Sequence, residues 1–297
     1  MELADRLRHL LGPGFSRPGL GAVARVGQAD CCGWRLEKLS FEGRDGEQVS
    51  ASFLHPPDGH PPVPAVIYAH AHGNRYHMGC EELSEGRPAL QGPYAPDLVR
   101  LGIAALCIEM PCFGARQQPG ESARAKAALW KGETLWGQML AEQIAGVDFL
   151  AAHPAIRPDG IGTLGFSMGS TLTFWLAALD SRVRACAAQC SLADLETLIG
   201  KGAHDGHGIY MTVPGVLPVA RTGQIAGLIA PRALHVSVGL QDWSTPKAAF
   251  DVARQDLEVA FAKGGQLSLH VEPDTGHEET PAMRRAVLTF LSSELAG

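Results

Sequence analysis

The chain has 297 residues, of which 45% are hydrophobic and 19% charged, and its formal net charge is −6 at pH 7. This apolar content excludes a disordered chain and allows one large α/β domain with a sizeable core. The acidic balance excludes a nucleic-acid-binding surface, and no run approaches the roughly 18 uninterrupted apolar residues of a membrane helix. The first residues, MELADRLRHLLGPG, do not resemble a secretory signal. Seven cysteines without metal-like spacing complete the expectation of a cytoplasmic protein with reduced thiols, contacting neither membrane nor nucleic acid.

The start of the chain favours antiparallel structure. Residues 1–30 read as a short helix, Glu2–Leu11, followed by a lead-in rich in Gly and Pro. The segments Trp34–Phe41 and Gln48–His55 alternate apolar and polar residues on either side of a turn-forming Gly-Arg-Asp-Gly sequence. This pattern predicts an antiparallel hairpin.

After residue 55, short apolar runs alternate with helical stretches. The expected strands are Ala65–Ala69, Ile103–Ile108, Ile161–Gly165, Ala185–Cys190, Ala233–Val238 and Leu267–Val271. The expected helices are Ala95–Arg100, Leu135–His153, Gly169–Leu179, Ala248–Lys263 and Pro281–Leu295. Runs that are apolar on both faces are typical of parallel strands covered by helices. The whole chain, 1–297, therefore reads as one α/β domain with a mostly parallel central sheet and helices on both faces.

Three segments do not fit the alternation of strand and helix. They are residues 74–93, 117–137 and 195–226, and the last is rich in Gly. The first two follow the ends of expected strands, where open α/β sheets bind their ligands. We expect these three excursions to form the walls of a pocket.

The sequence Gly165-Phe166-Ser167-Met168-Gly169 matches the pattern G-x-S-x-G. The bare pattern is weak, but here it directly follows an expected strand and directly precedes an expected helix. In that setting a serine sits on a tight turn with its hydroxyl above the sheet, and the helix N-terminus favours a developing oxyanion. Ser167 is therefore the candidate nucleophile, and the alternative is an ordinary strand-to-helix turn.

A nucleophilic serine needs a base, and the base needs a carboxylate that orients it. His277 follows the last expected strand, at the sheet edge from which it can reach Ser167, whereas His235 and His270 lie inside strands. Asp242 follows the preceding strand and is the preferred acid. Asp194 is the rival acid, although it also fits the start of a helix.

The oxyanion of an acyl-transfer reaction needs two backbone N–H donors. One is expected from Met168, the residue after the nucleophile. The other is expected from the loop after Ala65–Ala69, where two alignments are open and give either His72 or Asn74. We prefer His72.

Together these residues resemble the α/β-hydrolase superfamily, and within it the bacterial serine esterases of the dienelactone-hydrolase-like and acetyl-xylan-esterase-like groups. The resemblance covers residues 60–295 and rests on AHAHGN, LCIEMPCFGAR, IGTLGFSMGS, LIAPRALHVSVGLQDWSTP and DTGHEE. It implies the same triad of Ser167, Asp242 and His277. Dienelactone hydrolase itself has a Cys nucleophile where this chain has Ser167, so dienelactone is not implied as the substrate.

The expected function is hydrolysis of short-chain acyl or acetyl esters, with a small-molecule ester as the partner and neither metal nor organic cofactor. A prolyl-oligopeptidase-like peptidase and a non-catalytic binding protein are the alternatives.

Trp136, Tyr210 and Trp243 lie in segments expected around the strand ends and are candidate substrate-binding residues. His204, Asp205 and His207 do not suffice for a metal site. Arg116 is expected as a surface charge, with contact to a substrate carboxylate as the alternative. The sequence leaves open whether the chain forms a homo-oligomer.

Overall fold

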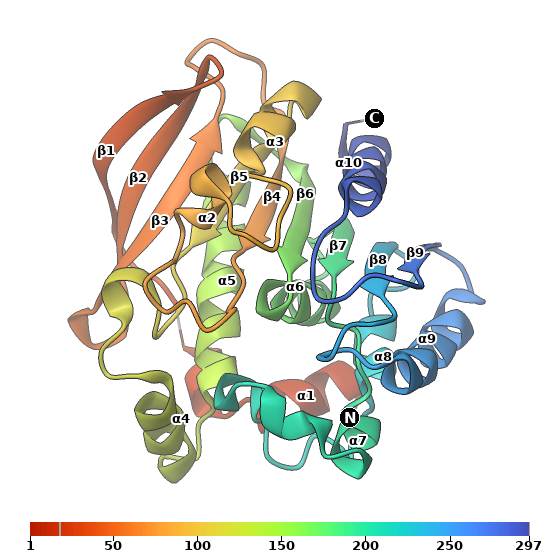
Figure 1. Cartoon of the computed structure of the whole chain (residues 1–297). Coiled ribbons are helices and arrows are strands. Elements are labelled where there is room, and N and C mark those ends of the chain that lie inside the picture. Colours follow the sequence, from red (N-terminus) through yellow and green to blue (C-terminus); the bar gives the residue numbers. More distant parts are fainter. Residues whose placement is uncertain (18, 297) are drawn as a thin grey trace.

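A nine-stranded mixed sheet forms the centre of the molecule in the computed structural model, which describes residues 1–17 and 19–296 (Figure 1). The strand order across the sheet is β1-β2-β3-β5-β4-β6-β7-β8-β9. The strands are β1 (Val23–Cys31), β2 (Trp34–Glu42), β3 (Gln48–His55), β4 (Val63–Ala69), β5 (Ala104–Ile108), β6 (Ile156–Phe166), β7 (Ala185–Gln189), β8 (Ala233–Gly239) and β9 (Gln266–Glu272).

The first three strands are antiparallel, as is the pairing of β3 with β5. The expected hairpin corresponds to β2 and β3, whose register pairs Leu39 with Ala51. Strand β1 was not predicted, and it lies largely within the segment expected to be a lead-in. Every residue of β1 is exposed or half-buried, so it lacks the buried apolar face that marks a strand in a sequence.

The six strands from β5 to β9 in the sheet order are parallel, which confirms the predicted fold class. All residues of β4, β5, β7 and β8 are buried. Because helices cover both faces of these strands, each residue can be apolar regardless of the side to which it points. This is why these strands were visible in the sequence as largely apolar runs.

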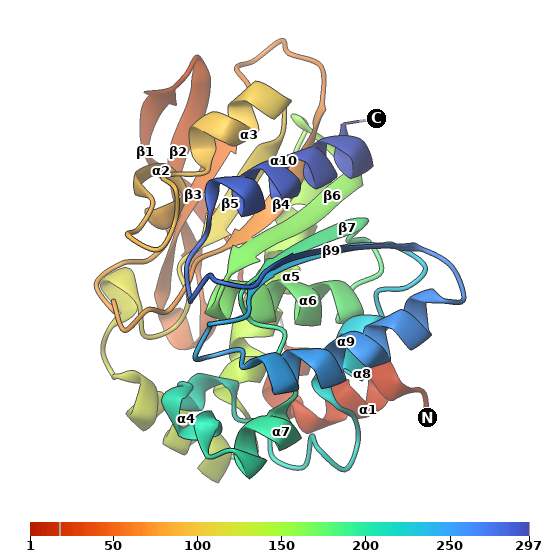
Figure 2. The same ribbon diagram turned by 45° about the vertical axis from the view of Figure 1, so that its right-hand side comes forward.

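Helices pack on both faces of the sheet (Figure 2). On one face, α3 (Ala95–Leu101) and α10 (Pro281–Leu295) contribute Leu98 and Val287 to a common core. On the other face lie α1 (Leu3–Leu10), α5 (Leu135–Ala152), α6 (Met168–Leu179), α8 (Thr222–Gly227) and α9 (Lys247–Phe261). For α1, α3, α5, α6, α9 and α10 these bounds agree with the expected helices to within two residues at each end. Helix α8 was not expected and overlaps the end of the third excursion.

The three excursions contain short helices of their own. They hold α2 (Glu82–Glu85), α4 (Glu121–Trp130) and α7 (Leu195–Gly200), and 3₁₀ turns follow α7 at Ala203–Gly206 and Ile209–Met211. In Figure 1, α4 and α7 lie at the lower end of the molecule, beyond the carboxyl ends of the parallel strands. The excursions therefore lie at the carboxyl ends of the parallel strands, where open α/β sheets bind their ligands.

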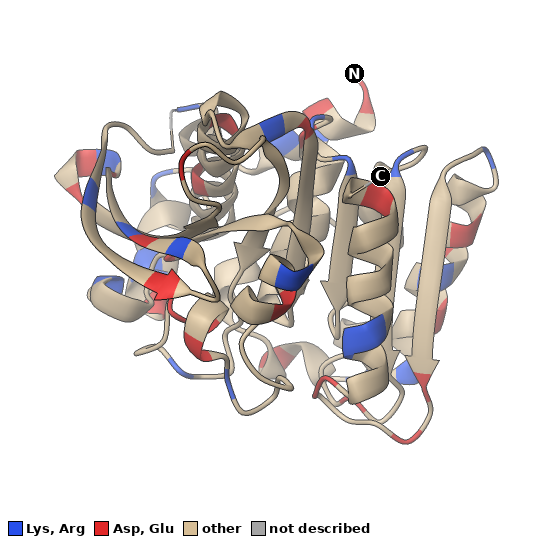
Figure 3. Ribbon diagram, turned by 90° about the horizontal axis from the view of Figure 1, so that it is seen from above, with Lys and Arg blue, Asp and Glu red and all other residues tan. Residues whose placement is uncertain are grey.

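Positions occupied by Lys or Arg and positions occupied by Asp or Glu are interspersed along the ribbon seen from above (Figure 3). Among the described helices, none has the length together with the apolar composition that crossing a lipid bilayer requires.

Candidate active site

Ser167 lies on the turn between β6 and α6 with φ 58° and ψ −120°. A non-glycine residue rarely adopts a positive φ, and the turn is possible here because its two glycines let the backbones approach closely. A Cβ on Gly169 would lie 1.9 Å from the carbonyl oxygen of Ala69, and one on Gly165 would lie 2.4 Å from the carbonyl carbon of Gly169. The flanking glycines of the pattern are thus required by packing between β4, β6 and α6.

The imidazole of His277 bridges Ser167 and Asp242. His277 Nε2 lies 2.8 Å from Ser167 Oγ, and His277 Nδ1 lies 2.8 Å from Asp242 Oδ2. A carboxylate only accepts hydrogen bonds, so Nδ1 carries the proton and Nε2 is free to accept the proton of the Ser167 hydroxyl. The Asp242 side chain is fully buried, whereas that of His277 is 18% exposed. The structure therefore brings the three predicted residues together in the order and geometry that nucleophilic catalysis requires.

Ser244 completes the surroundings of the carboxylate and was not identified from the sequence. Its N–H and its hydroxyl donate to Asp242 Oδ1 at 2.7 and 2.8 Å, and its Oγ lies 3.0 Å from His277 Nδ1. These bonds fix the orientation of the carboxylate. An Asp followed two residues later by Ser is a common local turn, which was the available signal in the sequence.

Asp194 caps a helix instead of contacting His277. Its carboxylate accepts from the N–H of Thr197 at 2.9 Å and from the hydroxyl of Thr197 at 2.7 Å, at the start of α7. This is the helix-start position that the sequence left open for Asp194, and of the two candidate acids it is Asp242 that contacts His277.

The loop after β4 and the start of α6 both face Ser167. Met168 is the first residue of α6, so its N–H has no acceptor within the helix. The N–H of Asn74 donates to His72 Nδ1 at 3.0 Å. That bond occupies the N–H of Asn74, and the backbone N–H of His72 stays the predicted second donor to an oxyanion.

Glu121, at the start of α4, holds the His72 side chain in place. With Nδ1 accepting from Asn74, His72 Nε2 is protonated and donates to Glu121 Oε2 at 2.7 Å. The same carboxylate accepts from the hydroxyl of Tyr76 and from the N–H of Tyr210, each at 3.1 Å. Burial alone would raise the pKa of Glu121, but these hydrogen bonds outweigh it and lower the pKa. No local pattern around residue 121 indicated this role.

A small pocket of about 100 Å³ opens above Ser167. Tyr210 and Trp243, two of the three predicted substrate-binding residues, line it. Trp136 is placed differently: it is 1% exposed and packs edge-on against Trp175, with ring centroids 6.2 Å apart. In the part of the chain that the structure describes, Trp136 is a core residue beneath Tyr210 and not part of the pocket lining.

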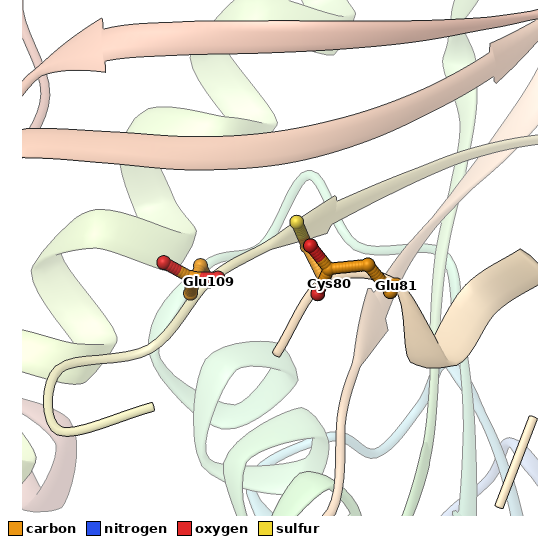
Figure 4. A group of neighbouring side chains, drawn as sticks. All are labelled: Cys80, Glu81 and Glu109. Carbon is orange, nitrogen blue, oxygen red and sulfur yellow. The ribbon is translucent and has the colours of Figure 1, made fainter. Parts of the chain in front are cut away.

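Groups that could hold a metal ion converge away from Ser167. Among residues 1–17 and 19–296, one thiol and two carboxylates, from Cys80, Glu81 and Glu109, place their ligand atoms within 4.8 Å of one another (Figure 4). The set around His204, which the sequence analysis had weighed, does not form such a group within these residues. Burial and the charge of Glu81 raise the pKa of Glu109 to about 7, and burial raises that of the Cys80 thiol to about 12. Glu109 and the Cys80 thiol therefore retain their protons to higher pH than exposed groups of the same kind.

The chain is similar to known proteins in both sequence and fold. The chain is 34% identical over 263 residues to a Bacillus subtilis (strain 168) protein named "Putative hydrolase YtaP", covering 88% of each chain. The fold is similar to that of acetyl xylan esterase 1 from Thermoanaerobacterium sp. JW/SL YS485, with a TM-score of 0.66, 17% identity and coverage of 99% and 98%. It is also similar to an acetyl xylan esterase from Paenibacillus sp. R4, with a TM-score of 0.69, 19% identity and coverage of 98% and 93%. No family model matches the chain.

Proposed function

Because the chain belongs to the family of Bacillus subtilis YtaP and has the α/β-hydrolase fold, we propose that it hydrolyses carboxylic esters through an acyl-enzyme formed on Ser167. The observation that carries the proposal is the hydrogen-bonded series Ser167–His277–Asp242, with both bonds at 2.8 Å. The solved structures of similar fold that are named as acetyl xylan esterases support an ester as the substrate.

The reaction begins when Ser167 Oγ attacks the ester carbonyl carbon and passes its proton to His277 Nε2. Asp242 stabilises the imidazolium that forms, and the N–H groups of Met168 and His72 hold the oxyanion. When the tetrahedral intermediate collapses, the bond to the alcohol oxygen breaks and His277 protonates that oxygen. Water, deprotonated by His277, then attacks the acyl-enzyme, and the proton returns to Ser167 as the carboxylic acid leaves.

The volume of the catalytic pocket favours a small acyl group next to Ser167. An apolar cavity of about 150 Å³ is large enough for a benzene ring, and this pocket is smaller, at about 100 Å³. This limit applies to the acyl half of the ester. Because an acetyl group is small, we expect p-nitrophenyl acetate to be a substrate.

The test compares the wild-type protein with Ser167→Ala. Substitution should lower the turnover of p-nitrophenyl acetate by at least about a thousandfold, as for other triads, without changing the thermal unfolding midpoint. A fluorophosphonate probe should label the wild-type protein at Ser167, located by peptide mass spectrometry. Residual turnover near the wild-type rate in the variant would refute the nucleophile, and preferential cleavage of an aminoacyl-proline amide would favour a peptidase. A folded protein that neither turns over esters nor reacts with the probe would favour a binding function.

A further inference from the structure

A second and larger cavity lies beside the catalytic pocket. Its volume is about 600 Å³, and all of its lining residues come from residues 195–218, within the third excursion. Its walls are mainly aliphatic, with contributions from Leu195, Leu198, Ile199, Val213, Val216 and Leu217. Such a lining is suited to an apolar ligand.

The two cavities share one wall. Leu195, Leu198, His207, Gly208 and Met211 line both of them. Met211 is among these shared residues, and an unbranched methionine adapts its shape readily. A substrate group that outgrows the catalytic pocket therefore meets the second cavity directly.

The position of the shared wall indicates which half of an ester would enter. Within residues 1–17 and 19–296, Trp243, Ser244 and His277 line the catalytic pocket but not the second cavity. His277 must lie next to the alcohol oxygen in order to protonate it. The acyl group lies on the opposite side of the carbonyl carbon from that oxygen. We therefore assign it to the part of the pocket lined by Leu195, Leu198 and Met211, which also line the second cavity.

From this arrangement we propose that the second cavity binds the acyl chain of medium-chain esters, with octanoyl as the representative. The inference rests on the proposed esterase function and extends it, because the catalytic pocket alone would restrict the enzyme to acetyl-sized groups. A cavity four times the volume that accommodates benzene, at about 600 Å³, has ample room for an eight-carbon chain. Octanoyl esters should therefore be hydrolysed with a kcat/KM at least equal to that of acetyl esters.

The test introduces a charge into the second cavity without touching the catalytic pocket. Ile199 lines only the second cavity and is 49% exposed, so Ile199→Asp should fold. Leu217→Asp probes another part of the same lining. Val259→Asp is the matched control, because Val259 is an exposed aliphatic residue on α9, 69% exposed and outside both cavities. A carboxylate in the lining attracts water and replaces apolar surface that the acyl chain would cover, so both cavity variants should lower kcat/KM for p-nitrophenyl octanoate at least about tenfold. Values for the acetate should stay within about twofold in all three variants.

A binding measurement separates this inference from the proposed function. In the Ser167→Ala background, calorimetric titration should show that sodium octanoate binds, and that Ile199→Asp weakens this binding at least about tenfold. Octanoate affinity unchanged by Ile199→Asp and Leu217→Asp, or lowered equally by Val259→Asp, would overturn the acyl-chain subsite even if acetate is hydrolysed. Octanoate binding that depends on Ile199, in a protein without any ester turnover, would support the subsite while contradicting the esterase function.

Discussion

Asp242 and Asp194 are two buried carboxylates that follow neighbouring strands, yet their partners differ. Asp242 accepts from His277 and twice from Ser244, whereas Asp194 accepts from Thr197. Changing Asp242 to Asn should therefore disturb the protonation of His277, because the amide NH₂ cannot accept the Nδ1 proton.

We expect Asp242→Asn to lower kcat for p-nitrophenyl acetate by about 10⁴, as the equivalent change does in serine proteases. Asp194→Asn is the matched control, because Asn caps helices as well as Asp and should leave both kcat and the unfolding midpoint near wild type. Steady-state kinetics and thermal melts measure both effects. A larger loss of kcat in Asp194→Asn would show that the acid has been assigned to the wrong residue.

The sequence predicted some side-chain contacts at this scale and failed to predict others. The order of Ser167, Asp242 and His277 along the chain, each just after a strand, was enough to predict which residues meet. Arg116 was predicted to be a surface charge, but it is 2% exposed and pairs with Glu142 and Glu47, each at 2.7 Å. Those partners are 26 and 69 residues away, and no local pattern reveals such a distant ion pair.

At the scale of elements, the excursions meet at one carboxylate. Glu121 of α4 contacts His72 in the loop after β4, Tyr76 in the first excursion and Tyr210 in the third. It thereby positions the loop that would supply the second oxyanion donor. The sequence predicted the excursions but not this connection, because it joins residues 49 and 89 positions apart.

Glu121→Ala should lower kcat about 10- to 100-fold, since losing an oxyanion donor altogether costs about 10²–10³. KM should change by less than about threefold, because the donor acts mainly on the transition state. Glu121→Gln keeps an oxygen that can accept from His72 Nε2 and should recover most of the loss. Glu196→Ala, at an exposed acidic residue in the first turn of α7, is the control. Kinetics on p-nitrophenyl acetate measure the effect, and a normal kcat in Glu121→Ala would exclude a positioning role.

Strands also differ in how well they can be predicted from their own sequences. Strands β4, β5, β7 and β8 are buried on both faces and were predicted from their apolar runs. Strand β1 has no fully buried residue and depends on pairing with β2 from Val23–Phe41 to Cys31–Trp34. Its formation is decided by the neighbouring strand, so its own composition carried little signal.

For the molecule as a whole, Glu109 links stability to pH. It is 1% exposed, lies beside Cys80 and Glu81, and has its pKa raised from 4.5 to about 7 by burial and by the Glu81 charge (Figure 4). Because the folded-state pKa exceeds that of the unfolded chain, the folded protein binds the proton more tightly. The contribution of Glu109 to stability is therefore fully present below pH 4.5 and is lost as the pH rises to about 7.

Replacing Glu109 by Gln should remove this dependence. One pKa unit corresponds to about 1.4 kcal/mol, so ionising Glu109 costs the folded state up to ~3 kcal/mol at pH 8. Glu109→Gln keeps an oxygen to accept the N–H of Ala115, now bound at 3.0 Å. Urea unfolding should show the variant gaining stability relative to wild type between pH 5 and pH 8, whereas Glu196→Gln, at an exposed position, should show no such gain. An equal difference between Glu109→Gln and wild type at both pH values would mean that Glu109 does not titrate in this range, because only a carboxyl group that ionises between them can make the difference depend on pH.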